Sequence, residues 1–417
     1  MGRRVTLLVC LMLCAVVAAP AAAARGGDEF AAIDAHALAA SASDARSASS
    51  LAAYLTRPAR DDREKARAIF RWIAHYIAYD GALLGRAPDP ESVLKQRRAV
   101  CTGYAVLFKA LAEASGVEAE IVEGHSKDAG YQVGRTAGTT PNHAWNAVKI
   151  DGQWRLLDCC WGAGRFDGSG RFVRRFTPHY FLTPPERFAA DHFPENARWQ
   201  LLDPPISGED YLNRARLKPA FFECGLWLVS HRSARIEAGD SLSVTIGAPP
   251  DAILSASLWQ GGRELGAPYT FAERQKDAFR VRVAFPRRGE YILRVYAAAD
   301  YTRGDELEWV LDYAVTAQSG SNGSEFPKTY GAFLTRNCRL DRPLRRALEA
   351  GKTVGFSLTV PGAEEVVVRT NGSTERLAAR GRGEFSGDTL IAGGPVTVFA
   401  KFPGKTRYEG LLQYVGR

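Results

Sequence analysis

The sequence predicts an α+β N-terminal domain followed by all-β, immunoglobulin-like sandwich domains. Before about residue 215, segments with helical spacing of apolar residues are mixed with strand-like segments. After about residue 221, only short strands with alternating apolar residues follow. The 417 residues are enough for two or three domains, and hydrophobic (46%) and charged (24%) fractions are typical of a globular protein.

The first 24 residues predict a cleavable export signal. Arg3 and Arg4 precede an apolar run over residues 5–17, and small residues lead to a cleavage site between Ala24 and Arg25. The run is shorter than the roughly 18 residues that an uncleaved membrane anchor needs. We therefore expect a periplasmic or secreted mature chain without a transmembrane segment. The preference for arginine over lysine indicates a bacterial source.

Residues 25–215 form the first predicted domain, with a core at about 60–205. Residues 25–60 carry little structural signal. A helix begins at Asp61 or Asp62, which are good N-caps, and its apolar face ends at Ile77. A second helix begins at Cys101 and stops at Gly116, and a strand covers residues 117–123.

A hairpin is predicted over residues 143–150 and 153–161, with Asp151-Gly152 as its two-residue turn. This turn pairs Ile150 with Gln153, and each step back along the first strand is then matched by one step forward along the second. His143 and Asp158 then become diagonal neighbours on one face, with Cα atoms about 7–8 Å apart. The same register places Cys160 opposite His143 and Trp145 opposite Asp158.

Two β-rich domains are predicted behind this one. Residues 220–317 contain four strands with clear alternation and form the first sandwich. Residues 318–327 are rich in glycine and serine and predict a linker, and residues 328–417 form a second β-rich domain.

Three residues suggest cysteine chemistry. Cys101 lies at a predicted helix N-terminus, where the helix dipole favours the thiolate, and Lys95, Arg97 and Arg98 just upstream favour it as well. His143 and Asp158 provide a base and the carboxylate that orients it. A nucleophile, a base and an orienting group are the requirements of acyl transfer by cysteine.

These segments resemble three motifs of the transglutaminase-like superfamily, which are papain-related cysteine enzymes. The motifs are VCTGYA at 100–105, NHAWNAV at 142–148 and WRLLD at 154–158. Further segments are most similar to the kyphoscoliosis peptidase branch of that superfamily: EKARAIFRWI at 64–73, WGAG at 161–164, YFLTPPE at 180–186, HFP at 192–194 and WQLL at 199–202. The resemblance covers roughly residues 60–205.

The resemblance implies a papain/transglutaminase-like fold in which Cys101 is the nucleophile, His143 the general base and Asp158 its orienting group. It also implies an oxyanion site made partly by the backbone N–H of the nucleophile and partly by an upstream side chain. Gln96 is the candidate for that side chain. The candidate substrate-binding residues are Trp145, Trp161 and Arg165.

The sequence departs from the family pattern at two places. Ala99 replaces a frequent glycine, and Cys159-Cys160 replace a common Ser-Thr pair. Pairing among Cys159, Cys160, Cys224 and Cys338 stays open.

We therefore predict an exported peptidase or amidase that acts on protein or peptide amides. A protein cross-linking transglutaminase and a non-catalytic envelope-binding scaffold remain as alternatives, and the β domains are candidates for binding protein or cell-envelope components. The histidines show no metal-ligand spacing, so neither a metal nor a cofactor is predicted. Without a dense basic tract, the net charge of +8 does not indicate a nucleic-acid partner.

Overall fold

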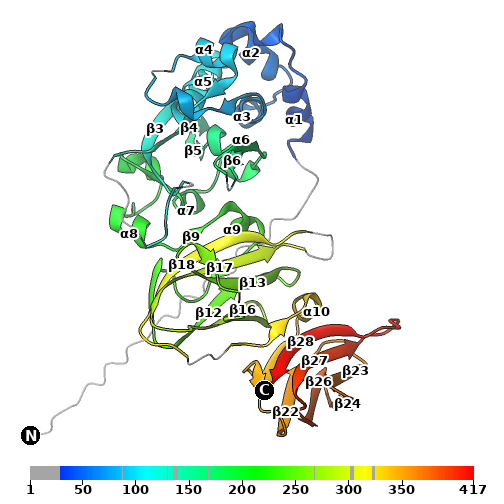
Figure 1. Ribbon diagram of the computed structural model, residues 1–417. Coiled ribbons are helices and arrows are strands. Elements are labelled where there is room, and N and C mark those ends of the chain that lie inside the picture. The colour runs from blue at the N-terminus through cyan, green and yellow to red at the C-terminus, as the bar shows by residue number, and fades with distance from the viewer. Residues whose placement is uncertain are drawn as a thin grey trace, which may run out of the picture.

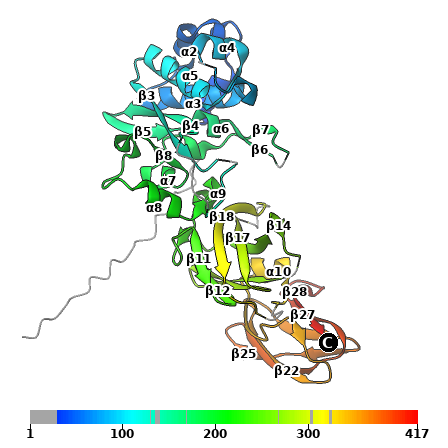
Figure 2. The same ribbon diagram turned by 60° about the vertical axis from the view of Figure 1, so that its left-hand side comes forward.

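The computed structural model describes residues 29–86, 88–128, 130–134, 140–167, 169–266, 268–300, 305–321 and 325–417. The predicted export signal and residues 322–324 of the predicted linker lie outside these residues. Figures 1 and 2 show three successive units, a helix-rich N-terminal unit followed by two β units. Within the described ranges, no helix is long and apolar enough to span a membrane.

The N-terminal unit packs helices against a four-stranded sheet of order β5-β4-β3-β8. Its α-helices are α1 Ala31–Leu38, α2 Ala48–Leu55, α3 Asp62–Tyr76, α4 Pro90–Gln96, α5 Cys101–Ala114, α6 Cys159–Ala163, α7 Pro185–Phe188 and α8 Gly208–Asn213. Its 3-10 helices are η1 Asp44–Arg46, η2 Gly81–Leu83, η3 Pro178–Tyr180 and η4 Ala197–Gln200. Its strands are β1 Ala78–Tyr79, β2 Arg98–Ala99, β3 Ala119–Ser126, β4 His143–Ile150, β5 Gln153–Leu157, β6 Gly164–Phe166, β7 Phe172–Arg174 and β8 His192–Pro194.

Both helices predicted in this unit are confirmed. Asp61 caps α3 by accepting a hydrogen bond from the N–H of Glu64 at 2.8 Å, and the helix buries an apolar face. Helix α5 begins at Cys101, and Gly116 follows its end in a left-handed conformation (φ +75°). The apolar faces of α3 and α5 join the sheet in one hydrophobic core.

The predicted hairpin is correct in register but too long. Ile150 pairs with Gln153, and the pairing continues to Asn146 opposite Leu157. Strand β5 ends at Leu157, and the next residues form helix α6 instead of the predicted strand over 158–161. Cys160 therefore does not lie opposite His143 in the sheet, because a helix turn carries it away from the strand axis.

Residues 25–60, which carry little signal in the sequence, contribute two helices where the structure describes them. Helices α1 and α2 bury Ile33, Leu51 and Leu55 against α3 and α5. The Asp34 carboxylate in α1 makes a double ion pair with the buried Arg67 guanidinium at 2.7 Å. These contacts lie far apart in the chain, so local sequence does not reveal them.

The first β unit is a sandwich of two sheets, with orders β10-β12-β16-β15 and β11-β18-β17-β13-β14, and β9 pairs with β18. Alternating residues of the two sheets fill one core. The elements are β9 Arg216–Leu217, α9 Pro219–Glu223, β10 Trp227–Leu228, β11 Arg235–Ala238, β12 Ser241–Gly247, β13 Ile253–Gln260, β14 Arg263–Glu264, β15 Thr270–Gln275, β16 Ala278–Ala284, β17 Gly289–Ala298 and β18 Glu308–Ala317.

The second β unit repeats this plan with sheets of order β19-β28-β27-β23-β24 and β20-β22-β26-β25, and β21 pairs with β28. The elements are β19 Lys328–Thr329, α10 Gly331–Thr335, β20 Arg339–Arg342, β21 Ala347–Leu348, β22 Thr353–Thr359, β23 Glu365–Thr370, β24 Ser373–Arg376, β25 Ala378–Gly381, β26 Glu384–Leu390, β27 Gly394–Lys401 and β28 Glu409–Gly416. The predicted fold class, an α+β core followed by immunoglobulin-like β-sandwiches, is confirmed.

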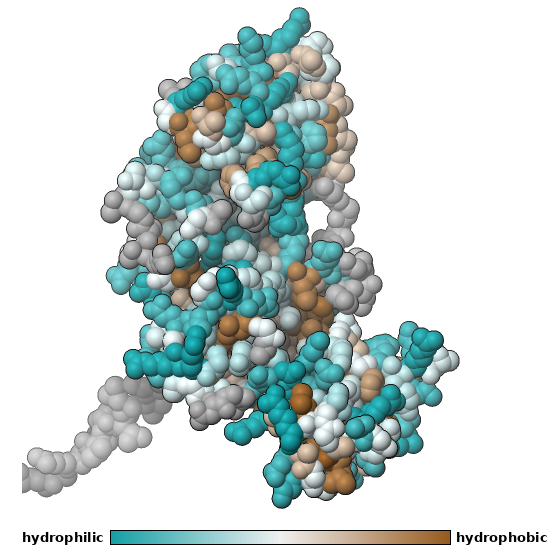
Figure 3. Space-filling view, in the orientation of Figure 1, coloured by the Kyte–Doolittle hydropathy of each residue, from teal (hydrophilic) through white to brown (hydrophobic). Residues whose placement is uncertain are grey.

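The first β unit contacts the segment that leads into β4. The Arg216 guanidinium donates hydrogen bonds to the carbonyl oxygens of Asp128 and Tyr131, both at 2.8 Å, and Arg235 bonds the carbonyl oxygen of Gly134. These hydrogen bonds join the first β unit to residues of the N-terminal unit that precede β4. The visible face is mostly hydrophilic, with hydrophobic residues in small separate patches (Figure 3).

Candidate active site

Cys101 is the first residue of α5, and its thiol is free and partly exposed. No side chain caps this helix, so the first backbone N–H groups are not covered by a capping side chain. Two contacts hold the helix start in place. The Tyr104 hydroxyl donates to the carbonyl oxygen of Ile77 at 2.8 Å, and Gly103 lies so close to Ala99 that an added Cβ would come within 2.7 Å of its methyl carbon.

His143 opens strand β4 and is 8% exposed. Its Nε2 lies 2.8 Å from Oδ2 of Asp158, which leaves Nδ1 to hydrogen-bond the Cys101 thiol. Burial disfavours the imidazolium, but the charge and hydrogen bond of Asp158 outweigh it, and the Cys101 thiolate adds to their effect. Together they raise the pKa of His143 to about 10.

Asp158 is the N-cap of α6 and is fully buried. Its Oδ1 accepts hydrogen bonds from the N–H groups of Cys160 at 2.8 Å and Trp161 at 3.0 Å. The predicted contact between His143 and Asp158 is therefore present, although a helix cap places the carboxylate and not a strand. Burial alone would raise the pKa of Asp158, but His143 and the hydrogen bonds hold it well below its usual range.

The electrostatic surroundings of Cys101 come mainly from His143. Burial raises the pKa of the thiol, but the hydrogen bond and charge of His143 and the N–H of Ala144 outweigh burial and lower it. Two of the three upstream basic residues make other contacts: Arg97 stacks over the Trp72 ring at 4.4 Å, and Arg98 pairs with Asp80 at 3.3 Å. The negative charge of the thiolate is therefore stabilised by the His143 imidazole and not, as predicted, by these arginines.

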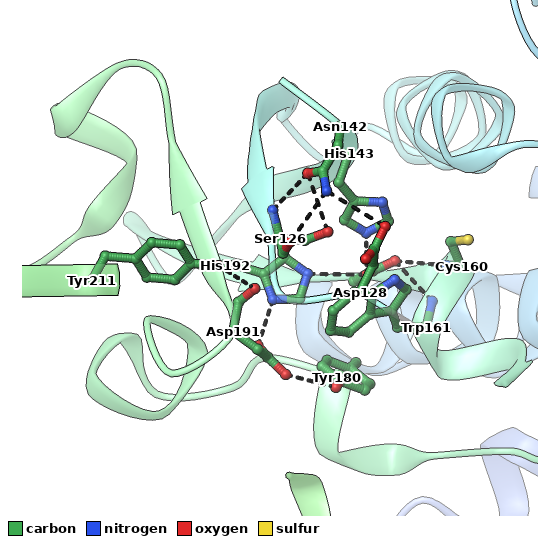
Figure 4. Close-up of polar contacts among 11 residues, drawn as sticks. Ser126, Asp128, Asn142, His143, Cys160, Trp161, Tyr180, Asp191, His192 and Tyr211 are labelled. Carbon is green, nitrogen blue, oxygen red and sulfur yellow. Dashed lines mark hydrogen bonds and ion pairs between the residues drawn. The ribbon is translucent and has the colours of Figure 1, made fainter. Parts of the chain in front are cut away.

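A second imidazole, which the sequence reasoning left without a role, lies on the other side of Asp158. Nε2 of His192 is 3.2 Å from the same Oδ2, and Nδ1 is 2.7 Å from Oδ1 of Asp191 (Figure 4). The Tyr180 hydroxyl bonds the other oxygen of Asp191 at 2.9 Å. The HFP segment of the family resemblance was the signal that could have singled out His192.

The remaining thiols of the site are buried. Burial, and then the negative charge of Asp158, raise the pKa values of Cys159 and Cys160 well above the usual range. Cys159, Cys160 and Cys338 are free thiols in the structure, so none of the disulfides left open for Cys160 is formed.

The other predicted site residues lie in different surroundings. Trp145 is 1% exposed and packs against His192 and Phe188, so it supports the imidazoles from the core. The partly exposed Trp161 ring lies 5.1 Å from the His143 ring. Arg165 is exposed on β6, and Gln96 is exposed at the end of α4, five residues before Cys101. No contact joins either of them to the thiol among the described residues, so their roles stay predictions.

One group within the described residues has the donor set for a metal ion, namely His143, Asp158 and His192, whose donor atoms lie within 4.8 Å of one another. Both imidazoles are hydrogen-bonded to the same carboxylate oxygen, and the other oxygen caps α6. The donor atoms are thus occupied by each other, and we assign them to proton chemistry.

Known proteins resemble this chain in its N-terminal unit and in its first β unit. The transglutaminase-like superfamily core matches residues 49–159, and the KY-like, immunoglobulin-like domain matches residues 209–328. Human (Homo sapiens) kyphoscoliosis peptidase is 32% identical over 279 residues, 66% of this chain and 41% of the relative. Hillarin from Drosophila melanogaster is 32% identical over 214 residues, 48% of this chain and 26% of the relative. A crystal structure of a TGase covers 37% of this chain and 38% of its own at 20% identity, with a TM-score of 0.21.

The chain spans about two fifths of the length of the kyphoscoliosis peptidases that it matches. The relationship extends over both the site and the β unit behind it. This chain therefore carries a transglutaminase-like superfamily core followed by a KY-like, immunoglobulin-like domain, and it is related to the kyphoscoliosis peptidases.

Proposed function

We propose that this chain is an exported cysteine peptidase or amidase that cleaves protein or peptide amides through an acyl-enzyme on Cys101. The observation that carries the proposal is the chain of contacts from the Cys101 thiol through His143 to Asp158. A thiol with a lowered pKa, a base and an orienting carboxylate in hydrogen-bond contact are the parts that acyl transfer requires.

The chemistry follows from these positions. The Cys101 thiolate attacks the amide carbon, and the oxyanion forms beside the N-terminal backbone N–H groups of α5. The His143 imidazolium then donates its proton to the leaving amine, and a thioester remains on Cys101. In the second half, His143 takes a proton from water and the resulting hydroxide attacks the thioester carbon. The C–S bond then breaks, so that the carboxylic acid leaves and the Cys101 thiolate is restored beside the His143 imidazolium.

Hydrolysis is favoured over amine transfer by the names of two relatives, the human and mouse kyphoscoliosis peptidases. If an amine replaced water in the second half, the same residues would cross-link proteins. The two outcomes differ only in the group that attacks the thioester.

Incubation of the purified chain with a peptide library, with and without a biotinylated primary amine, tests this proposal. We expect new peptide termini or conversion of glutamine to glutamate, and loss of both in Cys101→Ala. Incorporation of the amine as the main product would assign cross-linking instead. Absence of both products, together with absence of a Cys101 acyl-enzyme by mass spectrometry, would favour the non-catalytic scaffold.

The export part of the proposal rests on the N-terminal sequence pattern. Expression of the whole chain in a bacterial host should yield periplasmic protein that begins at Arg25. Cytoplasmic protein that retains residues 1–24 would contradict export without affecting the proposed chemistry.

A further inference from the structure

His192 is held between two carboxylates in the interior of the N-terminal unit. The residue is 1% exposed, and its two ring nitrogens lie 3.2 Å from Asp158 Oδ2 and 2.7 Å from Asp191 Oδ1. An ionised carboxylate only accepts hydrogen bonds, so both contacts are satisfied when both nitrogens carry hydrogen. The geometry therefore suits a buried ring that donates from both nitrogens, with a carboxylate at each end.

Aromatic rings fix the orientation of His192. The Phe188 ring stacks on it at 4.1 Å, and the rings of Trp161 and Trp145 lie at 4.6 and 5.0 Å. Strand β8 pairs with β3, and Tyr180 holds the Asp191 carboxylate. The imidazole cannot turn without breaking both of its carboxylate contacts, which Figure 4 draws as dashed lines.

His143 and His192 share a single oxygen atom of Asp158. Their Nε2 atoms lie 2.8 and 3.2 Å from Oδ2, and their ring centres are 5.4 Å apart. Because the other oxygen caps α6, neither imidazole can move to it without uncapping the helix. A positive charge on one ring disfavours a positive charge on the other, and both rings are stabilised by the same carboxylate charge.

This arrangement matters after the thioester has formed. Acylation removes the negative charge of the Cys101 thiolate, and His143 must then take a proton from water. If Asp158 contacted His143 alone, its negative charge would stabilise the protonated form of His143 and slow this step. A positive charge on His192, which contacts the same Oδ2, weakens this stabilisation.

We propose that His192 is a positioning residue that shares Asp158 with His143, aligning the carboxylate and keeping His143 able to accept a proton in the acyl-enzyme. This role rests on the proposed function of Cys101. It assigns His192, with Asp191 and Tyr180 behind it, to the breakdown of the acyl-enzyme and not to its formation.

Other titratable groups face this cluster and could contribute to a pH profile. On η3, burial lowers the pKa of His179 to about 4, so that ring is neutral at pH 7. Lys127 and Lys218 face Asp191, and burial lowers their pKa values to about 7 and about 8. Lys127 and Lys218 are therefore the groups whose titration must be separated from a change at His143.

The test uses His192→Gln, whose amide can still donate to Asp158 but carries no charge. With a chromogenic ester, burst kinetics measure acylation and deacylation separately from pH 5 to 10. We expect the midpoint of the deacylation profile to rise by about one unit, which slows deacylation about tenfold at pH 7. Acylation should change by less than about threefold. Lys127→Met and Lys218→Met are the matched controls, and each should leave the deacylation midpoint in place.

An unchanged deacylation profile in folded His192→Gln would overturn the inference. If that variant fails to fold, ¹⁵N-histidine spectra of the wild-type chain decide, because His192 with a single N–H at pH 7 would overturn it equally. Failure of the proposed function is a different result, since the wild-type chain would then form no acyl group on Cys101 at all.

Discussion

Two helices begin in the candidate active site, and each has cysteine in its first turn. Helix α5 begins with Cys101, and helix α6 begins with Cys159 and Cys160. Both starts provide N–H groups that favour a negative charge. Yet the pKa of Cys101 is lowered, while the pKa values of the α6 cysteines are raised well above the usual range.

The thiol pKa values differ because a different charged side chain lies beside each helix N-terminus. In α6 the carboxylate of Asp158 already occupies the first N–H groups, so its negative charge and full burial oppose a thiolate nearby. In α5 no side chain caps the helix, and the His143 imidazolium faces the thiol instead. A helix N-terminus by itself therefore does not activate a cysteine; the charge beside it decides.

Replacement of the nucleophile has the largest expected effect on this comparison. Cys101→Ala should lower turnover by about 10⁶-fold, as removal of a nucleophile does in serine proteases. The matched variant Cys160→Ala keeps the backbone N–H that bonds Asp158 and should stay within about threefold of wild type. Steady-state kinetics on any substrate from the peptide library measure both. Activity that survives in Cys101→Ala and disappears in Cys160→Ala would assign the nucleophile to α6.

Asp158→Asn tests the shared carboxylate. Asparagine is as good an N-cap as aspartate, so α6 should stay folded. Four N–H donors converge on the two oxygens of Asp158, and an amide offers only one oxygen to them. We expect turnover to fall by about 10⁴-fold, comparable to the same change in a serine triad. Circular dichroism checks the fold, and turnover within about twofold of wild type would remove Asp158 from the mechanism.

Alkylation compares the two helix starts directly. At about pH 6, iodoacetamide should modify Cys101 before any other described cysteine, because an ordinary thiol with a pKa near 8.5 is almost entirely protonated there. His143→Ala should slow this labelling about 10²-fold, since the neighbouring cation is lost. Mass spectrometry of the alkylated peptides identifies the site. Labelling of Cys159 or Cys160 first, or labelling of Cys101 that ignores His143, would show that the ion pair does not form.

The smallest expected effect is on stability. The pKa of His143 is raised from an ordinary 6.5 to about 10 in the folded chain. A group whose pKa is raised on folding contributes stability that is complete below pH 6.5 and is lost as pH rises toward 10. The unfolding midpoint of wild type should therefore fall by a few degrees more over this range than that of His143→Gln. Equal slopes in calorimetry would contradict a shared proton between His143 and Asp158.

Local patterns in the sequence determined much of the secondary structure and the register of the hairpin. Capping and apolar spacing predicted helices α3 and α5, because both depend on residues within a few turns. The Asp151-Gly152 turn predicted the register of the hairpin, since both residues adopt the left-handed conformation that a two-residue turn needs. Period-two alternation predicted the β-sandwich strands for the same local reason.

Tertiary structure decided the parts that depend on contacts distant in the chain. The strand continuing to Trp161 was locally plausible, but the Asp158 carboxylate caps a helix there and contacts His143 and His192 from two other strands. Burial, which no local pattern reports, raises the pKa values of Cys159 and Cys160, and the pairing of β8 with β3 places His192 between two carboxylates. The residue types of the site were thus present in the sequence, whereas their protonation depends on low exposure and on the charges that the fold brings together.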